Sequence, residues 1–338
     1  MTTLPPPVAI EDFEGPVTPK AFAALREQGR PAILRGLVAD WPAVGMANQG
    51  DAEIIGYMTR ERVPRPVAAI ATKPGAHGRF FYNDDVSGLN FVKGTGHLEM
   101  FLADLLKARD MPDAPGLAVQ SENIAEIMPA FARENRLDLL PSVPPRIWIG
   151  NRIRVAPHYD VKENIACCVA GRRRFTLFPP NQIANLYPGP FELTPAGTPV
   201  SMVDPLAPDL AKYPRFADAW QSAQQAVLEP GDAIYIPYCW WHGVESLEPV
   251  SILVNYWWND EEPEGIAGPY DALLHAIAAY RHLPPVKRDV WRGMLDYYVF
   301  EDNGDPAAHL PPHAKGILGP PEPGLFAKML GMIRGALG

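Results

Sequence analysis

The sequence predicts a mainly β protein with a jelly-roll core and helical additions on both sides of it. Between residues 145 and 262, short apolar runs alternate with turns rich in Gly and Pro, as strands do in closed or double-sheet β architectures. The 39 prolines among 338 residues favour turns and short strands over long helices. A composition of 47% apolar and 20% charged residues is that of a globular protein.

Residues 1–144 are expected to form strands and helices that flank this core. The first predicted helix covers residues 18–29. Thr18 suits its N-cap, Pro19 fits its first turn, and Gly29 fits the position after its last turn.

The rest of this N-terminal region predicts further short elements. The apolar spacing over residues 97–109 is typical of an amphipathic helix. A short strand is expected over 31–37, and strands separated by turns over 65–93. One or two more helices are expected over 121–139, beginning at a Ser121 cap.

The core region, residues 145–262, contains a series of short strand-like segments. We assign them to residues 146–160, 164–171, 173–179, 226–238, 240–247 and 250–258. A Pro-rich excursion, residues 181–225, separates the third segment from the fourth.

The last region, residues 263–338, predicts helices again. Helix-like patterns cover residues 269–283, 286–300 and 324–338. Apolar stripes run along 270–281 and 325–337. They could cover the barrel or meet a second copy of the chain, and we expect a homodimer formed through these helices.

Net charge, hydropathy and cysteine content limit the classes of partner and the cellular compartment that are expected. A net charge of −9 argues against a general nucleic-acid binder. No apolar run approaches the ~20 residues needed to span a bilayer, and the acidic, Pro-rich N-terminus does not resemble a signal peptide. Three cysteines, Cys167, Cys168 and Cys239, favour a reducing compartment over a disulfide framework. A cytoplasmic protein is therefore expected.

Three residues could form a metal site. His158 and Asp160 are two positions apart, so on a strand their side chains point the same way. His242, on a later strand, is the best candidate for a third ligand. Two His and one carboxylate form the facial triad of non-haem Fe(II) oxygenases, which leaves positions open for a 2-oxo acid and dioxygen. The alternative is a hydrogen-bonded surface pair. His275 and His282 lie on helix-like segments and are not expected to be ligands.

Three consecutive arginines follow the strand after His158. Alternation places Arg173 on one face of its strand with Phe175, and Arg172 and Arg174 on the other. An inward guanidinium could bind the distal carboxylate of a 2-oxo acid. The alternative is that all three arginines are solvated near the Gly171 turn.

Several motifs together resemble one family. They are HYD, an Asn six residues after His158, GRRRFTLFPP, NLYPGP, KYPRF, EPGDAIYIPYCWWHGVESL and LVNYWW. Over residues 145–260 they resemble the JmjC-type, cupin-like oxygenases, with the asparaginyl hydroxylases as the nearest members. The resemblance implies a double-stranded β-helix with iron at one mouth. It also implies hydroxylation of a C–H bond, with 2-oxoglutarate converted to succinate and CO₂.

The same resemblance implies roles for individual residues. His158, Asp160 and His242 would be the iron ligands. The residues near 2-oxoglutarate would be Arg173, Asn164, Asn255, Trp257 as a pocket wall, and Tyr82 as a less specific match to a family tyrosine. The alternative for Tyr82 is a core or rim aromatic.

The chain also departs from the nearest members. They carry a lysine where this chain has Arg173, and a threonine before the first metal His, where this chain has Val155 and Ala156. The segment from Gly150 to His158 is one residue shorter. These departures leave 2-oxoglutarate as the expected cosubstrate but change how its distal carboxylate is held.

The substrate and the rival functions stay open at this level. The substrate could be a protein side chain or a small molecule, with a peptide groove expected near residues 181–225 and the loops around residue 80. One rival is a catalytically inactive metal-binding cupin that acts as a sensor or scaffold. Another is a cupin of non-oxidative chemistry such as an isomerase, which an Asp ligand and an arginine suited to a diacid argue against.

Overall fold

The computed structural model describes residues 4–73, 75–260, 268–320 and 323–337. The chain divides into two compact units, Met1–Trp258 and Asn259–Gly338. The division into three regions at residues 144 and 262 stays a prediction, and residues 261–267 lie outside the described residues.

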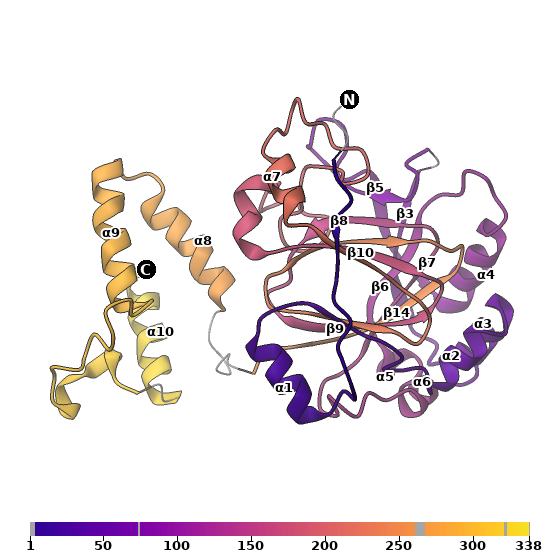
Figure 1. The fold of residues 1–338 in the computed structure, drawn as a ribbon, viewed down its shortest axis with the longest axis horizontal. Coiled ribbons are helices and arrows are strands. Elements are labelled where there is room, and N and C mark those ends of the chain that lie inside the picture. The colour runs from indigo at the N-terminus through magenta and orange to yellow at the C-terminus, as the bar shows by residue number, and fades with distance from the viewer. Residues whose placement is uncertain (1–3, 74, 261–267, 321–322, 338) are drawn as a thin grey trace. The chain divides into compact units, whose positions relative to one another are not determined.

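Two β-sheets form the framework of the first unit (Figure 1). The smaller sheet has the order β1 (Val8–Ala9), β11 (Gln224–Leu228), β10 (Arg173–Phe178), β13 (Trp241–Ser246), β8 (Arg154–His158) and β4 (Arg79–Phe80). The larger sheet has the order β2 (Ala32–Leu34), β12 (Ala233–Ile236), β9 (Glu163–Ala170), β14 (Ser251–Trp258), β7 (Arg146–Gly150), β6 (Leu117–Asn123), β3 (Pro66–Thr72) and β5 (Phe91–His97). The predicted mainly β, jelly-roll fold class is confirmed.

Each sheet has one face toward the other sheet. Residues such as Cys168 and Ile234 of the larger sheet pack with Phe175 and Leu177 of the smaller one. Alternation along the strands places these side chains inward. An apolar core therefore lies between the sheets, and the inward polar residues of the site interrupt it.

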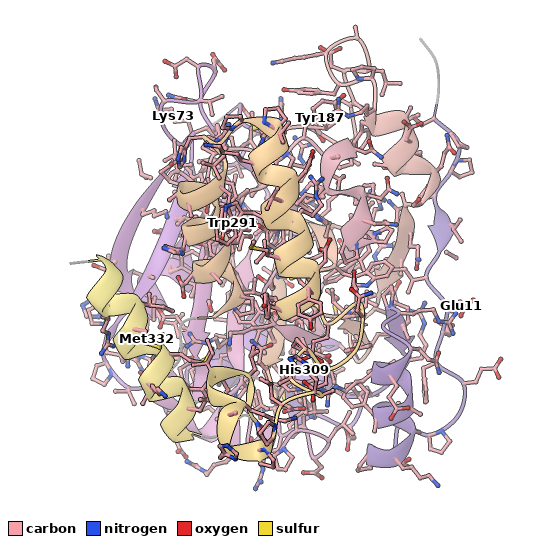
Figure 2. All side chains as sticks on the ribbon, turned by 90° about the vertical axis from the view of Figure 1, so that its left-hand side faces the viewer. Glu11, Lys73, Tyr187, Trp291, His309 and Met332 are labelled. Carbon is pink, nitrogen blue, oxygen red and sulfur yellow. The ribbon has the colours of Figure 1, made fainter. Side chains whose placement is uncertain are left out.

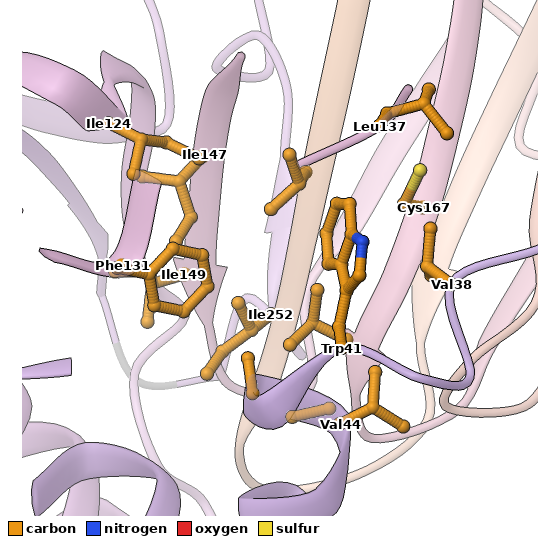
Figure 3. Packing of buried hydrophobic residues seen from close by; sticks show 14 of the residues in the cluster. Val38, Trp41, Val44, Ile124, Phe131, Leu137, Ile147, Ile149, Cys167 and Ile252 are labelled. Carbon is orange, nitrogen blue, oxygen red and sulfur yellow. The ribbon is translucent and has the colours of Figure 1, made fainter. Parts of the chain in front are cut away.

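The outer face of the larger sheet packs against a layer of helices. Ile147 and Ile252 of the sheet belong to one buried cluster with Trp41, Val44 and Phe131 of the helical layer (Figure 3). The helices of this layer are α1 (Pro19–Glu27), α2 (Pro42–Ala47), α3 (Asp51–Met58), α4 (Leu98–Ala108), α5 (Ile124–Ile127) and α6 (Pro129–Glu134). The helical layer therefore covers the face of the larger sheet that points away from the site.

Two of the expected N-terminal helices form where the sequence predicts them. In α1 the Thr18 side chain accepts a hydrogen bond from the Ala21 amide, and Pro19 occupies the first turn. Gly29 follows the helix with a φ of +60°. Helix α4 covers the segment predicted over 97–109.

The prediction that Ser121 caps a helix is wrong. Ser121 lies within strand β6 with a φ of +53°, where β6 slips in register against β7. Asn123 is the cap of α5 instead, and its side chain accepts from the Ala125 amide. A Ser and an Asn both suit an N-cap, so composition alone did not separate the two positions.

The Pro-rich excursion leaves the smaller sheet after β10 and returns at β11. It contains a 3₁₀ turn, η1 (Pro180–Asn185), and one helix, α7 (Phe216–Gln221). Between them the chain follows an irregular path that is pinned at Pro188 and Ser201 by a β-bridge.

The second unit is helical, as expected. Its helices are α8 (Pro269–Tyr280), α9 (Pro285–Tyr298) and α10 (Pro323–Leu337). Large apolar side chains remain exposed on them, with Trp291 at 41% and Met332 at 57% (Figure 2). No helix among the described residues has the length and apolar character to cross a membrane.

Candidate metal and cosubstrate site

A cavity of about 350 Å³ lies on the inner faces of both sheets. Seven of the eight residues singled out from the sequence line it: His158, Asp160, Asn164, Arg173, His242, Asn255 and Trp257. Tyr82 does not line it. Its ring is buried against Ala156 and Val200, and it lines a different cavity. A cosubstrate role for Tyr82 stays a prediction that this position does not support.

The two histidines and the aspartate converge at one point of this cavity. His158 ends β8 and lies directly across from His242 of β13, and Asp160 follows β8 by two residues. One ligand atom from each of the three residues lies within 4.8 Å of the others. His242 Nε2 is 3.5 Å from Asp160 Oδ2. Among the described residues, this is the one cluster of His, Cys, Asp and Glu close enough to share an ion.

A register shift in β8 brings His158 to the inner face. His242 pairs with His158, but Val244 pairs with Val155, so β8 has one residue more than β13 over this stretch. The extra residue falls at Ala156–Pro157, where proline has no amide to donate. Val155 and His158 are three positions apart and yet both line the cavity. Simple alternation would have placed them on opposite faces.

Backbone carbonyls fix the orientation of both imidazoles. His158 Nδ1 lies 3.0 Å from the carbonyl oxygen of Ala156, and His242 Nδ1 lies 3.0 Å from that of Trp240. A carbonyl only accepts, so each Nδ1 donates and each Nε2 keeps a free lone pair. Burial, reinforced by the nearby His242, lowers the pKa of His158. The ring is therefore neutral at neutral pH, the form that binds a metal.

The donor set fits a divalent transition metal. Two imidazole nitrogens and one carboxylate oxygen suit Fe, Zn or Ni better than Ca or Mg. Asp160 Oδ2 is buried without a hydrogen-bond partner, and a cation at this point would compensate it. All three side chains line the same cavity, so a ligand in the cavity could reach an ion held by them.

A buried arginine also lines the cavity. Arg173 is 4% exposed, and its Nε donates to Ser251 Oγ at 2.8 Å. Its Nη2 has no hydrogen-bond partner, and among the described residues no carboxylate lies within ion-pair distance of it. Burial lowers the pKa of Arg173 to about 10, so it still carries its charge at neutral pH. An unpaired buried cation is costly, and an anionic ligand would compensate it.

The neighbouring arginines are placed as alternation predicts. Arg172 pairs with Glu248 and Arg174 pairs with Glu245, while Phe175 and Leu177 share the inner face with Arg173. The alternative in which all three arginines are solvated does not hold, because Arg173 is buried.

A buried serine lies beside Arg173. Ser246 of β13 is the direct cross-strand partner of Arg173, is 4% exposed, and its hydroxyl has no hydrogen-bond partner. It is four residues along β13 from His242, a separation of about 13 Å along the strand. This backbone distance leaves room for a small dicarboxylate between the metal cluster at one end and the Arg173–Ser246 pair at the other.

Two asparagines and two tryptophans line the wall between these ends. Asn255 Nδ2 donates to Asn164 Oδ1 at 2.8 Å, and Asn255 Oδ1 has no partner. Trp257 and Trp148 meet edge to face, with ring centroids 5.9 Å apart. Both indole N–H groups are buried and unpartnered. This wall therefore offers donors and an acceptor to a polar ligand.

The sequence reasoning missed several residues that line the cavity or lie beside it. Trp148 lies at the middle of the RIWIG strand, between Ile147 and Ile149, and alternation could have placed it inward once those were assigned to the core. Nothing in the sequence around Ser246 marks it as a site residue. Only its position opposite Arg173 on the neighbouring strand identifies it. Other lining residues that it missed include Lys93, Gln120, Ser121, Pro195, Ala196 and Gly197.

Comparison with known proteins places the chain in a family. The model of the cupin-like domain matches residues 18–264, a longer span than the motifs between 145 and 260. The chain is 28% identical over 287 residues to the human bifunctional peptidase and (3S)-lysyl hydroxylase JMJD7, covering 75% of this chain and 85% of that protein.

Two other relatives align over shorter spans. The chain is 36% identical over 254 residues to Jumonji C domain-containing protein 5 of Drosophila melanogaster, covering 69% of this chain and 55% of that protein. It is 37% identical over 113 residues to the lysine-specific demethylase JMJ31 of Arabidopsis thaliana, covering 33% and 20%. The chain thus spans a fifth to just over half of these two relatives. Because the family match covers most of the chain, this protein belongs to the cupin-like domain family, whose relatives here include JmjC proteins named as a hydroxylase and a demethylase.

Proposed function

We propose that this protein is an Fe(II)- and 2-oxoglutarate-dependent oxygenase that hydroxylates a protein side chain or a small molecule. One observation carries the proposal: one cavity contains both a His₂Asp cluster and a buried guanidinium that has no carboxylate partner among the described residues. When bound, iron and 2-oxoglutarate would supply dioxygen activation, releasing succinate and CO₂.

The residues of the site would have three separate roles. His158, Asp160 and His242 would hold the metal from one side. Arg173 and Ser246 would hold the distal carboxylate of the cosubstrate, in the role of the lysine and threonine of the asparaginyl hydroxylases that the motifs resemble. The Trp148–Trp257 wall would exclude water from the reacting centre.

Succinate formation tests the proposal. Metal-free protein is incubated with 2-oxoglutarate, ascorbate and either Fe(II) or Zn(II), and succinate is measured by mass spectrometry. We expect iron-dependent succinate and none with zinc. Tight iron binding without any succinate, also in the presence of lysine-containing peptides, would favour the inactive sensor or scaffold.

The substrate is proposed to be a polypeptide, because two relatives carry names that specify lysine hydroxylation or lysine demethylation. A cytoplasmic location stays a prediction. The three cysteines, Cys167, Cys168 and Cys239, are free thiols, as expected in a reducing compartment.

Ser246→Ala is expected to weaken 2-oxoglutarate binding. The loss of one hydrogen bond to a carboxylate costs about 0.5–3 kcal/mol, or roughly two- to a hundredfold in Kd. Anaerobic titration followed by tryptophan fluorescence measures this. The analogue 2-oxobutanoate lacks the distal carboxylate and should bind the variant and the wild type equally. Equal weakening for both ligands would contradict the role of Ser246.

The homodimer is proposed to form through the helices of the second unit. Leu273, Val290, Trp291 and Met294 of α8 and α9 are 41–55% exposed, which favours a partner surface. Removing residues 266–338 should give a monomeric protein with little activity, as measured by light scattering and succinate formation. A truncated chain that stays dimeric, or a full-length chain that is monomeric, would contradict this.

A further inference from the structure

A row of charged residues crosses the outer face of the smaller sheet. Arg79 of β4 pairs with Arg154 of β8, Arg154 with Glu245 of β13, and Glu245 with Arg174 of β10. Phe80 and Val155, which follow Arg79 and Arg154 in the sequence, line the first cavity, the one that contains the metal cluster. The row is therefore on the side of β8 opposite to the cavity.

The positive charge of this row is only partly compensated. Arg174 and Glu245 form one ion pair. Arg79 and Arg154 share a single carboxylate oxygen, Asp204 Oδ2, at 3.6 and 3.3 Å from their Nη1 atoms. Like charges directly opposite on neighbouring strands are destabilising. Two half-buried guanidinium groups beside one carboxylate therefore leave one positive charge in excess.

Of these two arginines, Arg79 has the fewer hydrogen-bond partners for its guanidinium group. Its guanidinium makes no hydrogen bond with any described residue, and it lies over the ring of Phe81, 3.7 Å from the centroid. Burial and the nearby Arg154 lower the pKa of Arg79, while Asp204 opposes this. Its N–H donors are therefore available to a ligand.

A second cavity, of about 500 Å³, lies over Arg79 and Arg154. Aromatic rings of Phe81, Tyr82 and Tyr213 form part of its walls. Its exposed charges are those of Lys212, Asp84 and Asp209, which carry one positive and two negative charges. The lining as a whole therefore carries three positive and three negative charges, and the positive excess is local to Arg79 and Arg154 beside Asp204.

We propose that this second cavity binds one oxyanion, a carboxylate or a phosphate, carried on an apolar or aromatic body. Two guanidinium groups on adjacent strands can donate parallel hydrogen bonds to such a group. The volume exceeds that of one oxyanion and falls in the range of small-molecule sites. The aromatic walls suit the body that carries the charge. The site does not depend on the oxygenase activity.

Calorimetric titration of the full-length protein tests this site. The probes are inorganic phosphate, phenyl phosphate and an end-blocked Ala-Ala-Glu-Ala-Ala peptide. We expect saturable binding of phenyl phosphate that is tighter than that of inorganic phosphate. Saturable binding of the peptide as well would identify the source as an acidic side chain on a polypeptide, and its absence would identify a free small molecule.

Three variants distinguish binding at Arg79 from binding at an exposed arginine or in the first cavity. Arg79→Gln should weaken phenyl phosphate binding about tenfold or more, without lowering the melting temperature, because it removes a like-charged neighbour. Arg172→Gln makes the same charge change at an exposed ion pair and should bind like the wild type. Arg173→Gln, which changes the first cavity, should also bind phenyl phosphate as the wild type does. Wild-type binding by Arg79→Gln, loss of binding in Arg173→Gln, or no saturable binding of any probe would overturn the proposal.

Discussion

His158→Ala is expected to abolish metal-dependent turnover and to weaken metal binding by at least about 100-fold. The variant removes one of the three converging ligands, and the remaining His242 and Asp160 cannot replace it because they already occupy the other two positions. Competition with a chromogenic chelator under anaerobic conditions measures the metal affinity. Succinate formation measures turnover.

The matched control is His275→Ala. His275 is exposed on α8 and lies outside the His158, Asp160 and His242 cluster. This variant should bind metal and form succinate as the wild type does. If His158→Ala kept wild-type metal affinity, the ion would be held elsewhere and the proposed ligand set would be wrong.

Arg173→Met is expected to change stability and binding in opposite directions. The buried guanidinium has no counter-ion among the described residues, so an apolar side chain of similar length should raise the unfolding free energy by about 1 kcal/mol or more. Two charge-assisted hydrogen bonds to the cosubstrate would be lost, which should weaken 2-oxoglutarate binding roughly 100-fold. Thermal unfolding and anaerobic titration measure the two effects.

Arg174→Met provides the comparison for this variant. Arg174 is the next residue on β10, faces the other side of the sheet and pairs with Glu245. Its loss should leave 2-oxoglutarate affinity unchanged and stability equal or lower. If Arg173→Met bound 2-oxoglutarate normally, the cosubstrate would be anchored by another group.

Periodicity predicted the parts of the fold that depend on short-range pattern. The strands from Arg146 to Trp258 show alternation or continuous apolar runs, and each predicted strand segment forms at least one strand. The same alternation predicted that Arg173 lies on the same face of its strand as Phe175, and Arg172 on the opposite face. Residues two positions apart on a strand point to the same face. His158, Asp160 and His242 followed from ligand chemistry joined to strand spacing.

Features that depend on pairing between distant strands were not predictable. The cross-strand neighbour of Arg173 is Ser246, 73 positions later, and nothing local in the sequence indicates this register. Ser121 was mistaken for a cap because an irregular strand and a helix start use the same polar residues. The position of Tyr82 depends on how the β4 segment meets β8, which is likewise a long-range pairing.

The register shift at Ala156–Pro157 links the direction of the His158 side chain to the number of residues in β8. Substituting Ala156 by another small residue keeps the number of residues, so His158 should still reach the ion. Deleting Ala156 would remove the extra residue and place the imidazole two positions after Val155, so regular alternation should still direct it into the cavity. Only a change that separates Val155 and His158 by an odd number of positions in a strand without a bulge would turn the imidazole outward.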